Sequence, residues 1–265
     1  MKSRLFLTTL LAVCIQTASA FADKDTPWLD DTTLLKQVQN DLAGQGIKGV
    51  AAHAEAMDKA LTDAPQSIAL AREAGYVLTD GPADTLLSLM TAATAKDKKS
   101  VSAIANPYPQ IGLYLGSYYD EIGRKDDALR VLDAGLAISK VSSTRPFLLI
   151  ERGAALNGLH RSADALADFD DALKIPDVDI HMRAAMMRGR GFALTELNRL
   201  DEAEVAYQDS LKAEPGNSRA ENEIRYIAKL RAGGTHVEGT YTTMDAKVDA
   251  SGKVQDTPKA EPSNP

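Results

Sequence analysis

Catalytic and metal-binding motifs are missing from this sequence. The four histidines fall in different predicted elements, without two ligands spaced i, i+4 on one helix face, so their spacing indicates no metal site. They are His53, His160, His181 and His236. No Gly-x-Ser-x-Gly motif and no phosphate-binding loop occur. We therefore predict that the protein is not an enzyme and uses no cofactor.

Two short segments come near to known site motifs and fail in detail. Asp168 and Asp170 are spaced like the start of a calcium-binding loop, but Ala172 stands where the next ligand is needed. Gly189 and Gly191 lack the third glycine of a dinucleotide-binding turn and fall inside a predicted helix. Neither segment is predicted to bind a ligand.

Basic residues are also fewer than acidic residues. The 265 residues include 30 Lys and Arg against 37 Asp and Glu, a net charge of −7. The short lysine cluster from Lys96 to Lys99 is interpreted as a solvated loop. Nucleic-acid binding requires a basic patch, so we predict no nucleic-acid partner. The same acidity disfavours tight association with anionic lipid.

The first twenty residues have the pattern of a secretory signal peptide. Lys2 and Arg4 precede an apolar run from Leu5 to Ile15, which is too short to span a bilayer. Ala18-Ser19-Ala20 is a small-x-small cleavage site. We predict cleavage after Ala20 and a periplasmic or secreted protein without direct membrane insertion.

The single cysteine, Cys14, lies inside the apolar run. Lipoprotein anchoring there is the alternative, but Val13 fits poorly at the position before the cysteine. Cleavage after Ala20 would remove Cys14 and leave a mature chain with no thiol chemistry, which suits an oxidising compartment.

A pattern of small and large residues is repeated three times between residues 109 and 216. Each copy has a small residue, a large residue three positions later and an alanine twelve positions later. The three sets are Gly116, Tyr119, Ala128; Gly153, Leu156, Ala165; and Gly191, Leu194, Ala203. A polar turn separates the two halves of each copy, which predicts a helical hairpin. One hairpin cannot bury its own apolar face, so the hairpins must stack.

These positions resemble the tetratricopeptide repeat, whose pattern also closes on a proline, here Pro215. The copies depart from that family in lacking the opening aromatic residue and in recurring at about 37 residues instead of about 34. The resemblance implies an all-α superhelix of stacked helical hairpins that acts as a protein-interaction scaffold.

The predicted organisation has five parts. They are a signal peptide (1–20), degenerate helical hairpins of the same type (21–108), three repeats (109–216), a capping helix (217–232) and a disordered tail (233–265). Within the degenerate part we expect helices over 32–43, 47–62, 67–78 and 83–95. Residues 247–254 also fit a β-hairpin, an alternative to disorder.

The resemblance further implies a concave groove lined by the first helix of each hairpin. The positions carried over are Gln110, Leu113, Ser117, Asp120, Phe147, Ile150, Ala154, Asn157, Ala185, Arg188, Phe192 and Thr195. The family's clamp for terminal carboxylates is not reproduced. We expect apolar anchoring by Phe147, Ile150 and Phe192, with Asn157 and Arg188 setting orientation. Packing between repeats is the alternative role for the apolar members.

The favoured function is a periplasmic scaffold that holds a partner polypeptide, in envelope assembly or export. The alternative is an accessory protein that binds a glycan or peptidoglycan fragment. Aromatic residues make up 5% of the chain, and glycan sites usually need several exposed rings, so the first function leads. Homo-oligomers through the ends of the stack are left open.

The predicted processing can be tested by mass spectrometry of the protein purified after export. We expect a chain that begins at Phe21 and contains no cysteine. A chain that begins at Cys14 with added lipid mass would contradict cleavage after Ala20 and indicate a membrane-anchored protein.

Overall fold

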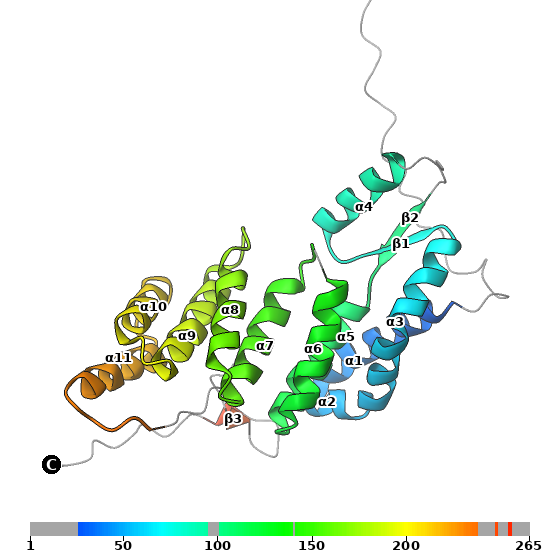
Figure 1. Ribbon diagram of the computed structural model, residues 1–265. Helices are drawn as coiled ribbons and strands as arrows, with labels where there is room; N and C mark the ends of the chain where they lie inside the picture. The colour runs from blue at the N-terminus through cyan, green and yellow to red at the C-terminus, as the bar shows by residue number, and fades with distance from the viewer. Residues whose placement is uncertain (1–25, 95–100, 140, 238–246, 249–253, 256–265) are drawn as a thin grey trace, which may run out of the picture.

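A computed structural model describes residues 26–94, 101–139, 141–237, 247–248 and 254–255 (Figure 1). These residues form eleven helices and two pairs of short strands. Most of the helices pair and stack side by side along one direction, which confirms the predicted superhelix of stacked hairpins. No helix within the described ranges is both long and apolar enough to cross a membrane.

The repeated pattern folds into three successive helix pairs, and one further helix follows them. Within each pair the two helices pack on each other, and the second helix packs on the first helix of the next pair. The final helix, α11, packs on α10. The elements are α5 (Tyr108–Glu121), α6 (Lys125–Ile138), α7 (Arg145–Gly158), α8 (Ser162–Leu173), α9 (Ile180–Glu196), α10 (Leu200–Ala213) and α11 (Ser218–Arg231).

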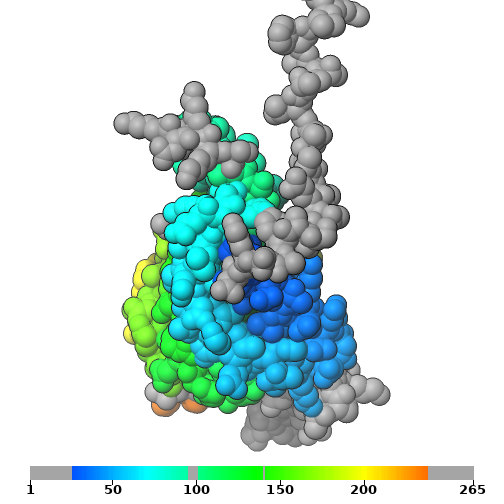
Figure 2. Space-filling model, turned by 90° about the vertical axis from the view of Figure 1, so that its right-hand side faces the viewer, coloured from blue at the N-terminus to red at the C-terminus, as the bar shows by residue number. Residues whose placement is uncertain are grey.

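The stack begins with α1 (Pro27–Gln45), the short α2 (Lys48–Ala51) and α3 (Ala54–Glu73). Figure 2 shows α1 to α3, in blue to cyan, covering this end of the molecule. Helix α3 packs on α1 and on α5, so α1 and α3 act as a pair ahead of the three repeats. The expected helix end near residue 62 is wrong, because α3 continues through Pro65 to Glu73.

A strand–helix–strand unit interrupts the helical stack between α3 and α5. Strand β1 (Tyr76–Thr79) pairs in parallel with β2 (Ser102–Ala105), and α4 (Pro82–Thr94) connects them. The register runs from Tyr76 opposite Ser102 to Thr79 opposite Ala105. Parallel strands cannot be joined by a tight turn, and α4 provides most of the required crossover. In Figure 1 the two strands lie between α3 and α4.

This unit corrects the prediction of a helical hairpin over residues 67–95. Residues 67–73 of the expected helix 67–78 belong to α3, and its last three residues lie in β1 instead. Gly75 leaves α3 with a φ of 88°, a value that glycine adopts without strain. The four residues that follow, Tyr-Val-Leu-Thr, are rich in the aromatic and β-branched side chains that favour strands. The expected helix over 83–95 corresponds to α4.

The tail contains a small antiparallel pair, β3 (Lys247–Val248) with β4 (Val254–Gln255). This pairing agrees with the hairpin alternative, since Val248 faces Val254 in the register. The remaining tail residues and the predicted signal peptide lie outside the described residues.

The packing between repeats depends on glycine facing an aromatic ring. The Phe169 side chain of α8 is fully buried and lies against Gly153 of α7 and Gly189 of α9. A Cβ atom at Gly153 would lie 2.8 Å from the Cζ atom of Phe169, and one at Gly189 would clash with the same ring. The alanines of the repeated pattern, Ala165 among them, are fully buried. Small residues therefore set the spacing of the helices.

Replacing Gly153 or Gly189 by alanine should destabilise the protein, although alanine is the better helix former. We expect a loss of about 1–3 kcal/mol, because the added methyl group overpacks a buried ring. Gly44 in α1 has no atom within 4 Å of a Cβ placed there, so Gly44→Ala should stabilise by about 0.5–1 kcal/mol. Urea unfolding measures both effects, and a gain at all three positions would contradict the packing described.

Candidate functional site

The structure does not leave the predicted groove residues as one open surface. Half of them, Ile150, Ala154, Asn157, Arg188, Phe192 and Thr195, are buried. A second set, Gln110, Leu113, Ser117, Asp120 and Ala185, is partly exposed. Phe147 is 44% exposed. The first helices of neighbouring pairs touch, α5 with α7 and α7 with α9, so packing between repeats accounts for the buried apolar members.

Arg188 is engaged inside the protein. It is 6% exposed, and its guanidinium forms an ion pair with Glu214, which follows α10. His181 Nδ1 lies 3.0 Å from the other oxygen of Glu214, and the Asn217 side chain donates to the carboxylate at 3.2 Å. Burial raises the pKa of Glu214, but the hydrogen bonds from His181 and Arg188 outweigh it and leave the pKa below its ordinary value. Arg188 therefore fastens the end of α10 to α9.

Three further polar groove residues are also bonded within their own chain. Gln110 accepts a hydrogen bond of 2.9 Å from the side chain of Gln39 in α1. Asp120 forms an ion pair of 2.7 Å with Lys125. Asn157 donates to a carbonyl oxygen of α9 at 3.4 Å, while its own Oδ1 is buried and has no hydrogen-bond partner among the described residues.

Asp168, from the segment that fails as a calcium loop, is likewise bound within the stack. Arg152 of α7 donates to both of its oxygens, at 2.8 and 2.6 Å, and to Asp133 of α6 at 2.6 Å. One guanidinium thus joins three consecutive helices. Across the described part of the chain, no group of three or more His, Cys, Asp or Glu could hold a metal ion.

Phe147 lies instead in an open groove at the edge of the stack. The groove has a volume of about 580 Å³ and lies between the β1–α4 turn, the α6–α7 loop and the α8–α9 loop. We call it the rim groove. Its lining is largely apolar and includes Pro82, Val141, Phe147, Ile175, Val178 and Met182. Val141 and Phe147 are both more than two-fifths exposed, which leaves apolar surface open at the mouth.

Helix α4, beside the rim groove, turns its apolar face to solvent. It contains no buried residue, and its large apolar side chains are exposed to solvent. We call these four residues the α4 stripe: Leu86 at 63%, Leu87 at 52%, Leu89 at 38% and Met90 at 59%. The opposite face is small and polar and holds the helix to the strands. There the Thr85 hydroxyl lies 2.8 Å from that of Thr79, and Asp84 accepts from the backbone N–H of Asp80 at 2.9 Å.

The α4 stripe and the rim groove are continuous. Pro82 and Ala83 line the groove and form the first turn of α4. Residues three or four positions apart share a helix face, so Leu86, Leu87 and then Met90 follow them along one side. Met90 comes seven residues after Ala83, so at 1.5 Å per residue the surface runs about 10 Å beyond the groove. Sequence reasoning missed it because 83–95 was interpreted as half of a packed hairpin. The signal available in the sequence was that the large apolar residues of this helix fall on one face, whereas Asp, Thr, Ser and Ala fall on the other.

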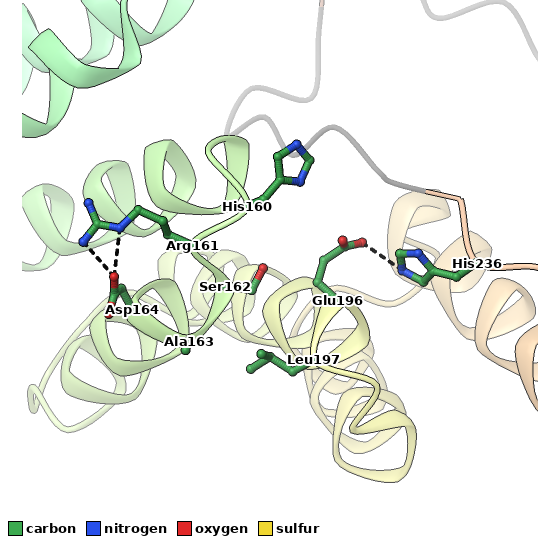
Figure 3. Close-up of a pocket in the computed structure, with 8 residues that line it drawn as sticks. All are labelled: His160, Arg161, Ser162, Ala163, Asp164, Glu196, Leu197 and His236. Carbon is green, nitrogen blue, oxygen red and sulfur yellow. Dashed lines mark hydrogen bonds and ion pairs between the residues drawn. The ribbon is translucent and has the colours of Figure 1, made fainter.

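A second cavity, of about 460 Å³, lies at the turns inside the α7–α8 and α9–α10 pairs (Figure 3). Its two carboxylates have partners: Glu196 lies 3.3 Å from the His236 ring, and Arg161 donates to Asp164 at 2.9 and 2.7 Å. His160 closes α7 with a φ of 59°, as a turn residue. Both carboxylates of this cavity therefore already have a partner within the protein.

No family model matches the chain, and no curated protein matches it. Among solved structures, the first tetratricopeptide-repeat domain of human RPAP3 is similar at 26% identity over 48% of this chain and 94% of its own, with a TM-score of 0.43. The first such domain of Spaghetti (RPAP3), bound to the HSP90 peptide SRMEEVD, is similar at 26% identity over 47% and 94%, with a TM-score of 0.40. The similarity to these domains covers about half of the chain.

Arg188→Met should destabilise the fold, because Glu214 would keep its partial burial and lose its permanently charged partner. We expect a loss of about 1–3 kcal/mol near pH 7. The pKa of Glu214 is lower in the folded protein than in the unfolded chain. The ion pair therefore stabilises the fold fully at pH values above the unfolded pKa, and this contribution is lost as the pH falls through the folded pKa. The difference from wild type should therefore shrink as pH falls below about 4.5.

Urea unfolding at several pH values measures this effect. Arg199→Met is the control, because its pair with Glu202 is exposed on both sides and should contribute little. An Arg188→Met protein as stable as wild type at every pH would contradict the structural role of Arg188.

Proposed function

We propose that the protein is a scaffold that binds an apolar segment of a partner polypeptide along the α4 stripe and in the rim groove. The outward-facing apolar side of α4 is the observation that carries the proposal. A helix of a soluble protein normally turns this side to the core, and a contiguous apolar patch left on the surface marks an interaction site. The stacked hairpins supply the rigid support that such a surface needs.

The expected affinity comes from removing apolar side chains from water. Full burial of a leucine or methionine side chain contributes about 1.5–3 kcal/mol, and the α4 stripe offers four that are at least 38% exposed. The groove adds the exposed ring of Phe147 at one end. A segment that covers both would bury the α4 stripe, whose residues span about 6 Å along the helix axis, together with one anchoring pocket.

The chemistry of this surface favours a polypeptide over a glycan. The α4 stripe is made of leucine and methionine, which adapt to varied apolar side chains. Aromatic rings, which glycan sites need, are represented at the groove by Phe147. The signal-like residues 1–20 support a role in the periplasm or outside the cell, and we propose that the partner belongs to envelope assembly or export.

A peptide selection tests the proposal. Random 12-residue peptides displayed on phage are selected on the full protein, and the affinities of the recovered peptides are measured by fluorescence anisotropy. In a Leu87→Gln, Met90→Gln variant, affinity should fall at least tenfold, equivalent to about 1.4 kcal/mol. The fold should be kept, because both side chains are exposed and glutamine is a good helix former.

The matched control is Ile122→Gln, Val205→Gln. It removes two apolar side chains of similar exposure, 47% and 53%, from other parts of the surface. Its affinity should equal that of wild type, and circular dichroism should show the same helicity for all three proteins. Recovery of no peptide that depends on Leu87 and Met90 would refute the proposed site.

A further inference from the structure

The rim groove is acidic as well as apolar. Its lining contains three carboxylates, from Asp80, Asp177 and Asp179, and one cationic side chain, Arg145. Arg145 turns its guanidinium to the end of α6, where it donates to the carbonyl oxygen of Ser139 at 2.7 Å. No ion pair joins the three carboxylates to a cation of the described chain. The groove therefore carries negative charge that its own side chains do not match.

Two of the three carboxylates accept hydrogen bonds from the backbone, and the third belongs to a residue in a fixed turn. Asp179 caps α9 and accepts hydrogen bonds from the N–H groups of His181 and Met182, at 2.8 and 3.3 Å, which lower its pKa and keep it ionised. Asp177 is held in a left-handed turn with a φ of 56° and is exposed. Asp80 is 6% exposed and accepts from the backbone N–H of Thr144 at 3.3 Å. The acidic groups are thus held at the groove while the loops keep their conformation.

We propose that the segment bound by this surface is basic at one end and apolar along the rest. A lysine or arginine would lie in the rim groove near Asp177 and Asp179, and the apolar residues that adjoin it would cover the α4 stripe. This inference rests on the proposed function and specifies its partner. A cation beside a dry apolar surface is attracted to a neighbouring carboxylate more strongly than a cation in open water, because the local dielectric constant is lower.

The same charges argue against two other occupants. A second copy of the chain would bring a net charge of −7 against an acidic groove. The four side chains of the α4 stripe also fall short of the roughly 800 Å² per partner that stable dimers bury. Anionic lipid headgroups would be repelled by the carboxylates at the end of the stripe. A separate basic and apolar polypeptide segment is the occupant that fits both parts of the surface.

The test removes the charge and keeps the backbone. Asparagine caps helices about as well as aspartate and tolerates the left-handed conformation, so Asp177→Asn, Asp179→Asn should fold as wild type does. The control, Glu121→Gln, Asp126→Asn, removes two exposed charges at the turn between α5 and α6, at the other end of the helices. Equal unfolding midpoints establish that all three proteins are comparably folded.

Peptides selected on wild-type protein should be enriched in Lys and Arg at one end relative to the unselected library. Peptides selected on Asp177→Asn, Asp179→Asn should lack this enrichment, and those selected on the control should keep it. The best wild-type peptide should lose about tenfold in affinity on the charge-removed variant, and added salt should reduce that difference.

The outcomes separate the two proposals. Peptides that depend on Leu87 and Met90 but show no basic bias would overturn this inference and leave the scaffold function standing. A basic bias that persists in Asp177→Asn, Asp179→Asn would also overturn it, since another group would then select the charge. If no selected peptide depends on the α4 stripe, the scaffold function itself fails. Dimer formation lost on Leu87→Gln, Met90→Gln would instead identify a second copy as the occupant.

Discussion

The structure depends on the fit of large side chains against glycine. Phe169 fills the space between Gly153 and Gly189, so three consecutive helices approach one another around a single ring. Because such interiors are close-packed, a methyl group more or less at these positions alters the spacing of the helices. Arg152 of α7 adds polar contacts between helices, because its guanidinium donates to Asp133 of α6 and to Asp168 of α8. Shape fixes the distance between helices, and the guanidinium bonds link their surfaces.

This fit explains why the repeats could be predicted from the sequence. Wherever one helix pair stacks on the next, small and large residues are needed at fixed separations. The stacking therefore produces a pattern that can be recognised in the sequence. The strand–helix–strand unit has no such repeated pattern in its sequence. Tyr76 to Thr79 is four residues long, and a short apolar run cannot be assigned to helix or strand by its period alone. Its pairing partner, β2, lies more than twenty residues away.

The candidate site was predictable only in small part. Phe147 is exposed but lies in the rim groove at the edge of the stack, and Arg188 and Phe192 are buried, because neighbouring first helices touch. Spacing gives the face on which a residue lies and does not give the distance to the next repeat. The rim groove is built from three loops far apart in sequence, and its carboxylates meet through tertiary structure alone.

The attachment of α4 has a consequence for how this protein can diversify. The helix adjoins β1 and β2 and buries no side chain of its own, so its outward residues take no part in the core. Substitutions there change the surface offered to a partner at little thermodynamic expense, whereas the stack tolerates few changes at its glycines. Variation can therefore accumulate on the inserted unit while the repeats stay constrained, which gives one framework the freedom to acquire new binding preferences.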